Sequence, residues 1–224
     1  YQQTVWRKFD RVQVFTARDA AALANLSPAM AERVRVNPFG VELPPPGPSQ
    51  AERAGELLFV GNFTHPPNVD AALWLGRVIL PRVRALQPDA HLTLVGIFPP
   101  SEVLSLASDG LTVTGPVPDI APYFEQAAVC VAPIRTGGGM RAKALKAMAY
   151  GKAVVTTSRG AAGLTLAGAQ PPVLMAEDAD GLARSVAGLL ADPARRQELG
   201  RAARVYVAEQ FSPGAYVSRL ESIF

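Results

Sequence analysis

The chain has 224 residues, of which 49% are hydrophobic and 18% are charged, and its formal net charge is +3 at pH 7. This composition is that of a globular protein with a substantial core and excludes a disordered chain. No dense basic run occurs, so nucleic acid is not expected as a partner, whereas an anionic small ligand and an acidic membrane surface fit about equally well.

The few cysteines and histidines limit metal and disulfide chemistry. Cys130 is the single cysteine and lies in an apolar run, which predicts a buried core residue. His65 and His91 are far apart, so a structural zinc site is not expected. We also expect no other metal and no cofactor. No apolar stretch approaches the roughly 20 residues that span a bilayer. The N-terminus has no signal-peptide pattern and lacks Met, so we expect a cytoplasmic fragment.

The first 55 residues predict a small unit and a linker. A strand is expected over 12–16, a helix over 18–25 and an extended run over 33–37. The segment from Leu43 to Pro48 contains four prolines and cannot form a helix or an inner strand. We therefore assign residues 1–43 to a separate piece, 44–55 to a proline-rich linker, and 56–224 to the main domain.

The rest of the chain alternates short apolar runs with helical patterns. Strands are expected over 57–60, 92–97, 111–114, 129–133, 154–157 and 173–175, and helices over 68–86, 101–107, 120–127, 140–150 and 180–190. Two more helices follow over 194–210 and 213–223, with Asp192 and Ser212 as N-caps before Pro193 and Pro213. This alternation predicts an α/β fold with a Rossmann-like, doubly wound parallel sheet and helices on both faces.

Ligands of such sheets bind at the carboxyl ends of the strands, so the loops there carry the functional signal. The loop after the first of these strands begins with Gly61, which permits close backbone approach, and Asn68 is expected to cap the next helix. His65 is either a surface side chain or a ligand contact.

A glycine-rich loop after the fourth strand is the strongest signal. Gly137, Gly138 and Gly139 precede a helix whose first N–H groups would face an anion. Arg135, Arg141 and Lys143 add positive charge, which suits a diphosphate; the alternative is a plain connecting loop.

Two further features are less specific. Lys143 and Lys146 share one face of the next helix, as either ligand contacts or an ordinary solvated face. Ser158 to Leu164 is rich in small residues and forms either a ligand-facing loop or a plain turn.

The order of these motifs from Leu57 to Phe211 resembles the C-terminal, donor-binding domain of family 4 retaining glycosyltransferases (glycosyl transferases group 1), which have the GT-B fold. The resemblance rests on Phe59-Val60-Gly61-Asn62-Phe63 with Pro67-Asn68-Val69-Asp70-Ala71, Leu94-Val95-Gly96, Val113-Thr114-Gly115-Pro116-Val117 with Asp119, Val131-Ala132-Pro133, Gly137-Gly138-Gly139-Met140-Arg141-Ala142-Lys143, Ala147-Met148-Ala149-Tyr150-Gly151-Lys152, Val154-Val155-Thr156-Thr157 with Gly163-Leu164, and, upstream, Asn37-Pro38-Phe39-Gly40-Val41-Glu42.

The resemblance implies a nucleotide-sugar donor, a sugar or lipid-linked acceptor, and transfer with retention. Residues 1–36 would be the last part of the acceptor domain, the final helix would return to it, and the missing acceptor domain would provide any peripheral contact with the inner membrane face. The fragment alone is expected to be inactive. The donor-binding residues carried over are Gly61, Asn62, His65, Gly137, Gly138, Gly139, Met140, Arg141, Lys143, Lys146, Gly163 and Leu164, with Arg141 and Lys143 as stabilisers of the leaving diphosphate.

Two positions depart from the family pattern. Lys146 stands where most relatives have a glutamate that accepts hydrogen bonds from the ribose, and lysine has no acceptor. Gly138 replaces a second glutamate, as in a glycine-rich subgroup, but Ala162 stands where that subgroup often has a glutamate. The alternative function is therefore a degenerate, non-catalytic module for binding or interaction. A sugar-nucleotide epimerase on the same fold is disfavoured, because the acidic and histidine residues it needs are missing here.

Overall fold

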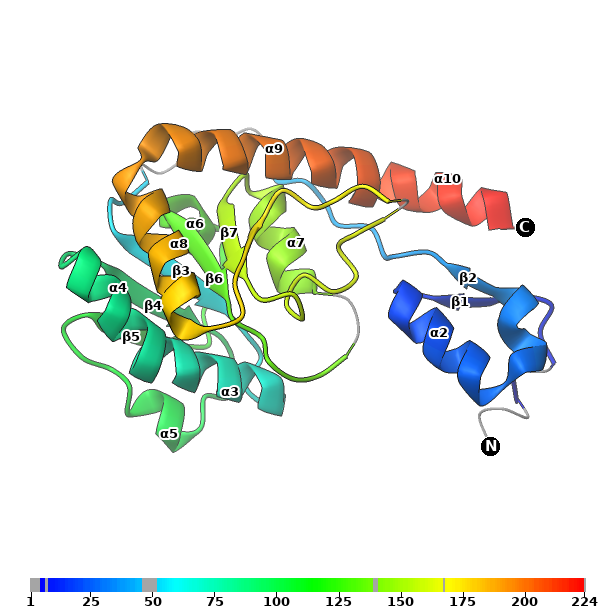
Figure 1. The fold of residues 1–224 in the computed structure, drawn as a ribbon, viewed down its shortest axis with the longest axis horizontal. Helices are drawn as coiled ribbons and strands as arrows, with labels where there is room; N and C mark the ends of the chain where they lie inside the picture. Colours follow the sequence, from blue (N-terminus) through cyan, green and yellow to red (C-terminus); the bar gives the residue numbers. More distant parts are fainter. Residues whose placement is uncertain (1–4, 7, 46–51, 139–140, 167, 224) are drawn as a thin grey trace.

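The computed structural model describes residues 5–6, 8–45, 52–138, 141–166 and 168–223. Its main body is a six-stranded, fully parallel sheet in the order β5-β4-β3-β6-β7-β8 (Figure 1). The strands are β3 (Glu56–Val60), β4 (His91–Val95), β5 (Leu111–Gly115), β6 (Val129–Ala132), β7 (Ala153–Thr156) and β8 (Leu174–Met175). The strand order reverses between β3 and β6, which makes the carboxyl ends of these two strands the expected ligand site.

Helices pack on both faces of this sheet, as the alternating pattern predicts. One face is covered by α3 (Pro66–Trp74), the π-helical turn η2 (Leu75–Ile79), α4 (Leu80–Leu86), α5 (Ser101–Leu104) and α8 (Ala179–Ala191). The other is covered by α6 (Ala121–Gln126), α7 (Ala142–Ala149) and α9 (Pro193–Phe211). The α/β fold is confirmed, and the single helix predicted over 68–86 is instead three consecutive segments that begin at Pro66.

Alternate residues of each strand supply the two cores. Leu57 and Phe59 of β3 face the first helical layer, while Leu58 faces the second. Cys130 is buried in the second core, as predicted, and burial raises the pKa of its thiol to about 12. Asp192 caps α9 by accepting from the Arg195 N–H, as the sequence predicts.

The N-terminal segment forms a separate small unit. It contains β1 (Val12–Val14), α2 (Ala17–Leu26), the 3₁₀ turn η1 (Pro28–Arg33) and β2 (Val34–Val36), with β1 and β2 paired in parallel. The last helix, α10 (Pro213–Ile223), extends from α9 to this unit (Figure 1). There Arg219 Nε donates to Asn37 Oδ1 at 3.0 Å, so the final helix returns to the N-terminal unit as the resemblance implies. The domain bounds stay a prediction, and residues 46–51 of the linker lie outside the described residues.

Candidate functional site

A cavity of about 640 Å³ opens at the carboxyl ends of β3 and β6, where the strand order reverses. It brings together eight predicted site residues from three segments: Gly61, Asn62, His65, Gly137, Gly138, Arg141, Lys143 and Lys146. Val60, Pro67, Asn68, Phe124 and Ala142 complete its lining. Gly139 and Met140, also predicted here, lie outside the described residues.

The loop after β3 is held by backbone and amide contacts. The Gly61 N–H donates to the Val95 carbonyl, and a Cβ added at Gly61 would lie 3.3 Å from the Asn68 side chain. Asn62 Oδ1 accepts from both the N–H and the hydroxyl of Thr64. These contacts give the wall of the cavity a defined shape.

Asn68 does not cap α3, contrary to the sequence-based expectation. The helix begins two residues earlier, because Pro66 occupies its first turn and His65 the N-cap position. The Asn68 side chain instead donates to the Asn62 carbonyl at 2.7 Å and accepts from Lys143 Nζ at 2.6 Å. Asn68 therefore joins the β3 loop to α7.

The glycine loop is shaped by Arg141. Its guanidinium donates to the carbonyls of Gly137 and Gly138, each at 3.1 Å, and to that of Arg159 at 3.0 Å. Arg141 is only 8% exposed, and burial, followed by the charges of Arg159 and Arg18, lowers its pKa. Because these carbonyls turn toward Arg141, the side chain both fixes the loop and adds positive charge beside the cavity.

Lys143 and Lys146 both reach this cavity from α7 but differ in environment. Lys146 is exposed. Lys143 is half-buried, with Nζ 5.7 Å from the centroid of the Phe59 ring. Burial, and secondarily the charge of Arg141, lower the pKa of Lys143 to about 8. No carboxylate pairs with it among the described residues, so Lys143 is a cation without a counterion at the wall of the cavity.

Arg135 does not contribute its charge to the cavity as expected. Its guanidinium pairs with Asp70, at 3.1 Å from Nε and 2.5 Å from the second nitrogen, and lies 4.6 Å from the centroid of the Trp74 ring. Both partners belong to α3, and the ion pair raises the pKa of Arg135. The Arg135 side chain thus connects the start of the glycine loop to α3.

Gly163 and Leu164 are not among the residues that line the cavity. Gly163 has a φ of +84°, and the Leu164 side chain is fully buried in the second core. The Leu164 N–H donates to the Ala161 carbonyl, and the Leu164 carbonyl accepts from the Tyr206 hydroxyl at 2.6 Å. This segment forms a turn, and its Ala161 and Leu164 side chains are buried in the same core as α7.

The cavity is lined by one sign of charge. Arg141, Lys143 and Lys146 contribute cations, and no aspartate or glutamate stands among the described lining residues. Within the described part of the chain, no group of three acidic, histidine or cysteine side chains is placed to hold a metal ion. None of the described helices is both long and apolar enough to cross a membrane. The site is built to attract a small anion.

Sequence reasoning missed the roles of Asn68 and Phe124. Phe124 comes from α6 and lines the cavity, and its ring stacks on that of Tyr150 with the ring centroids 4.8 Å apart. Asn68 could have been found from the proline pair before it, because prolines favour the first helical turn and place Asn68 inside the helix.

Comparison with known proteins identifies a family whose model matches this chain. The family model described as "Glycosyl transferases group 1" matches residues 54–192. A curated relative from Rhizobium leguminosarum bv. viciae, named lipopolysaccharide core biosynthesis mannosyltransferase LpcC, is 33% identical over 118 residues. That match covers 52% of this chain and 33% of the relative, so the chain matches about a third of the relative's length.

Solved structures share the fold over nearly the whole chain. TarM has a TM-score of 0.81 at 12% identity, covering 99% of this chain and 45% of its own. Sucrose-phosphate synthase from Thermosynechococcus elongatus has a TM-score of 0.72 at 24% identity, covering 96% and 57%. WaaG, described as a glycosyltransferase of lipopolysaccharide biosynthesis, has a TM-score of 0.74 at 18% identity, covering 95% and 62%. These similarities confirm the predicted Rossmann-like GT-B fold.

Proposed function

The chain belongs to the glycosyl transferases group 1 family, and from this membership we propose that it is the donor-binding half of a retaining glycosyltransferase. The enzyme would move a sugar from a nucleotide-sugar to a saccharide, lipid-linked or polymeric acceptor. The curated relative named for lipopolysaccharide core biosynthesis supports an acceptor of the polysaccharide class. Transfer needs the acceptor domain as well, so binding is the readout for the present chain.

One observation carries the proposal: a cavity with cationic and, among its described lining residues, no acidic side chains lies at the topological switch point, between the β3 loop and the glycine loop. A volume of about 640 Å³ is within the usual range for small-molecule sites. Gly137 and Gly138 let the diphosphate approach their backbone, and Lys143 offers a charged donor at the same wall. Gly61, Asn62 and His65 border the part of the cavity left for the rest of the donor.

The same residues account for the chemistry that this half would supply. When the bond between the anomeric carbon and the diphosphate oxygen breaks, negative charge develops on the leaving diphosphate. Lys143 and Arg141 are already in place near that charge, so they stabilise it without a large rearrangement. In this proposal cationic side chains take the role that a metal ion plays elsewhere, and no cofactor is required.

One observation favours a second candidate function. In it, the donor site is degenerate and non-catalytic, and the domain serves as a binding or interaction module. Lys146 lines the cavity, and no carboxylate among the described lining residues is available to accept from ribose hydroxyls. Titration calorimetry of the full chain with UDP, GDP and ADP separates the two candidates when Lys146→Glu is measured in parallel.

For a working donor site we expect one nucleotide to bind wild type, and Lys146→Glu to bind it equally or more weakly, because a cation near the phosphates has become an anion. Should wild type bind none of the three while Lys146→Glu gains binding, the site is a decayed one and the second candidate replaces the first. Thermal unfolding of both proteins verifies that each is folded.

The affinity for a nucleoside diphosphate should fall as pH rises. The pKa of Lys143 is about 8 in the free protein, and a bound anion favours the ammonium form. Above pH 8 binding must therefore take up a proton, and affinity drops by up to about tenfold per pH unit. Calorimetry from about pH 7 to about pH 9.5, above the phosphate pKa near 6, measures both the affinity and the proton uptake. A pH-independent affinity without proton uptake would contradict the placement of the diphosphate on Lys143.

A further inference from the structure

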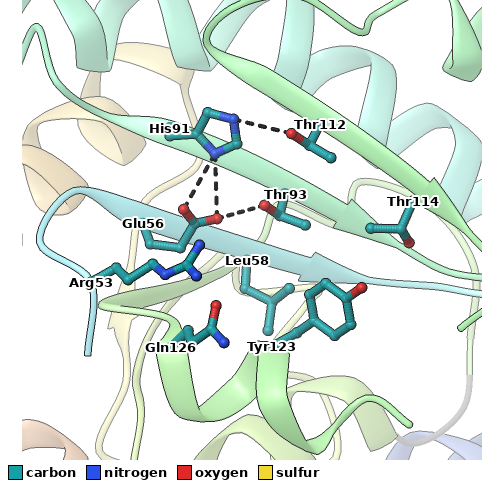
Figure 2. A pocket seen from close by; sticks show the side chains of 9 residues that line it. All are labelled: Arg53, Glu56, Leu58, His91, Thr93, Thr112, Thr114, Tyr123 and Gln126. Atoms are coloured by element: carbon teal, nitrogen blue, oxygen red, sulfur yellow. Dashed lines mark hydrogen bonds and ion pairs between the residues drawn. The ribbon is translucent and has the colours of Figure 1, made fainter. Parts of the chain in front are cut away.

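A second cavity, of about 390 Å³, lies on the sheet face that α6 and α7 leave uncovered at β4 and β5. In Figure 2 its side chains come from the first halves of β3 and β4, from β5, from α6, and from Arg53 in the segment before β3. It shares no lining residue with the cavity at the glycine loop. Tyr123 lines this second cavity and its neighbour Phe124 lines the other, so α6 stands between the two.

The polar side chains of this cavity hold one another in place. Glu56 Oε1 accepts from the Thr93 hydroxyl at 2.6 Å, and the two Glu56 oxygens lie 3.4 and 3.3 Å from His91 Nδ1. The opposite ring nitrogen of His91 lies 3.2 Å from the Thr112 hydroxyl (Figure 2). Four side chains from three strands therefore form a continuous network, which fixes their orientation before any ligand arrives.

Other groups remain available to a ligand. The Tyr123 ring stands on the α6 side, opposite the strand residues, and Arg53 lies beside Glu56 (Figure 2). Within the described part of the chain, neither the Arg53 guanidinium nor the Tyr123 hydroxyl has a hydrogen-bond partner. The cavity thus offers hydrogen-bond donors, acceptors that also serve the network, and the ring of Tyr123.

The balance of these groups selects among ligand classes. The cavity is lined by one arginine, Arg53, and one glutamate, Glu56, so it lacks the surplus of positive charge that a phosphate or a nucleic acid requires. Of the described residues, none forms a cluster with three metal ligands, which disfavours a metal ion. Leu58 is the one aliphatic residue among the described residues of the lining, so an apolar peptide would find little to contact there. A ligand with many hydroxyl groups and an apolar ring face matches both the mixed donors and acceptors and the tyrosine ring.

We propose that this cavity is a binding site for an uncharged saccharide, separate from the donor cavity. A sugar ring packs its C–H face on Tyr123, while its hydroxyl groups donate to Glu56 and Thr112 and accept from Arg53. The site would hold a segment of a glycan chain on the donor-binding domain without taking part in transfer. This inference rests on the second cavity alone and does not depend on which nucleotide the chain binds.

Titration of the ¹⁵N-labelled chain with methyl glycosides and trisaccharides of glucose, mannose and galactose tests the proposal. We expect at least one sugar to bind with a dissociation constant on the order of 1 mM and to shift the amide signals of Thr93, Thr112 and Gln126. Thr112→Val and Tyr123→Leu, which alter side chains at the surface of the cavity, should each weaken this binding about tenfold or more. Lys146→Gln, which lines the other cavity, should leave it unchanged.

Three results would overturn the proposal. The first is that no saccharide in the panel binds at concentrations on the order of 50 mM. The second is that binding shifts the signals of Gly61 and Gly137 and is weakened by Lys146→Gln instead. The third is that glucuronate or inorganic phosphate binds more tightly than the uncharged sugars at Thr93 and Thr112. Failure of nucleotide binding leaves all three readouts intact, so the two proposals are tested independently.

Discussion

Replacing Lys143 by glutamine should weaken the binding of a nucleoside diphosphate by about 10- to 100-fold. Lys143 is the half-buried lysine of the cavity, and no carboxylate competes for its charge among the described residues. A hydrogen bond to a charged group contributes about 1.5–3 kcal/mol, which corresponds to this change in affinity. Titration calorimetry at pH 7 measures the difference directly.

Lys146→Gln is the matched control for this prediction. Both lysines lie on one face of α7 and line the same cavity, but Lys146 is exposed. Its removal should weaken binding only about two- to fivefold, because solvent screens an exposed charge. Glutamine at position 143 keeps a donor for Asn68 and removes a buried charge, so Lys143→Gln should not unfold the chain. Equal effects of the two substitutions would show that the cavity attracts anions without a specific role for Lys143.

Gly138→Val should abolish diphosphate binding while leaving the fold unchanged. Among the described residues, no heavy atom lies within 4 Å of a Cβ added at Gly138, so there is room for the side chain beside them. The free energy of unfolding should therefore change by less than about 0.5 kcal/mol, as for other surface substitutions. If the diphosphate approaches the backbone here, the valine occupies its place and affinity falls by about 100-fold or more.

Gly137→Val provides the contrast within the same loop. Gly137 has a φ of +88°, and an added Cβ would lie 2.9 Å from Pro67 Cγ. Backbone strain of this kind costs on the order of 1–3 kcal/mol, so this variant should lose both loop structure and binding. Thermal unfolding distinguishes it from Gly138→Val. Wild-type affinity in Gly138→Val would remove the glycine loop from the proposed donor site.

Local signals were sufficient to predict the architecture. Short, continuous apolar runs such as Val129–Ala132 form strands that are buried on both faces, and this burial leaves little freedom in their assignment. Asp192 before Pro193 marked the start of α9, because capping depends only on neighbouring residues. The glycine loop was predicted for the same reason: consecutive glycines after a buried strand permit close backbone approach wherever the strand lies.

The interaction partners of individual side chains could not be predicted without the tertiary structure. Arg135 could have faced the cavity, but the position of α3 offered it Asp70 and Trp74, and an ion pair with ring packing is favoured over a solvated charge. Asn68 and Lys143 are 75 residues apart, and only the approach of α3 to α7 joins them.

The second cavity is the clearest case of a feature that the sequence does not reveal and the tertiary structure does. In the sequence, His91 is an isolated histidine far from any metal ligand, and Glu56 and Thr112 carry no signal beyond that of ordinary strand residues. Parallel register places Glu56 beside His91 and leaves Thr112 within reach on β5. The helices of that face cover β3, β6 and β7 but not this part of β4 and β5, so the polar side chains remain accessible. Element type follows from periodicity along the chain, whereas the chemistry of a surface depends on which strands become neighbours and which faces the helices leave open.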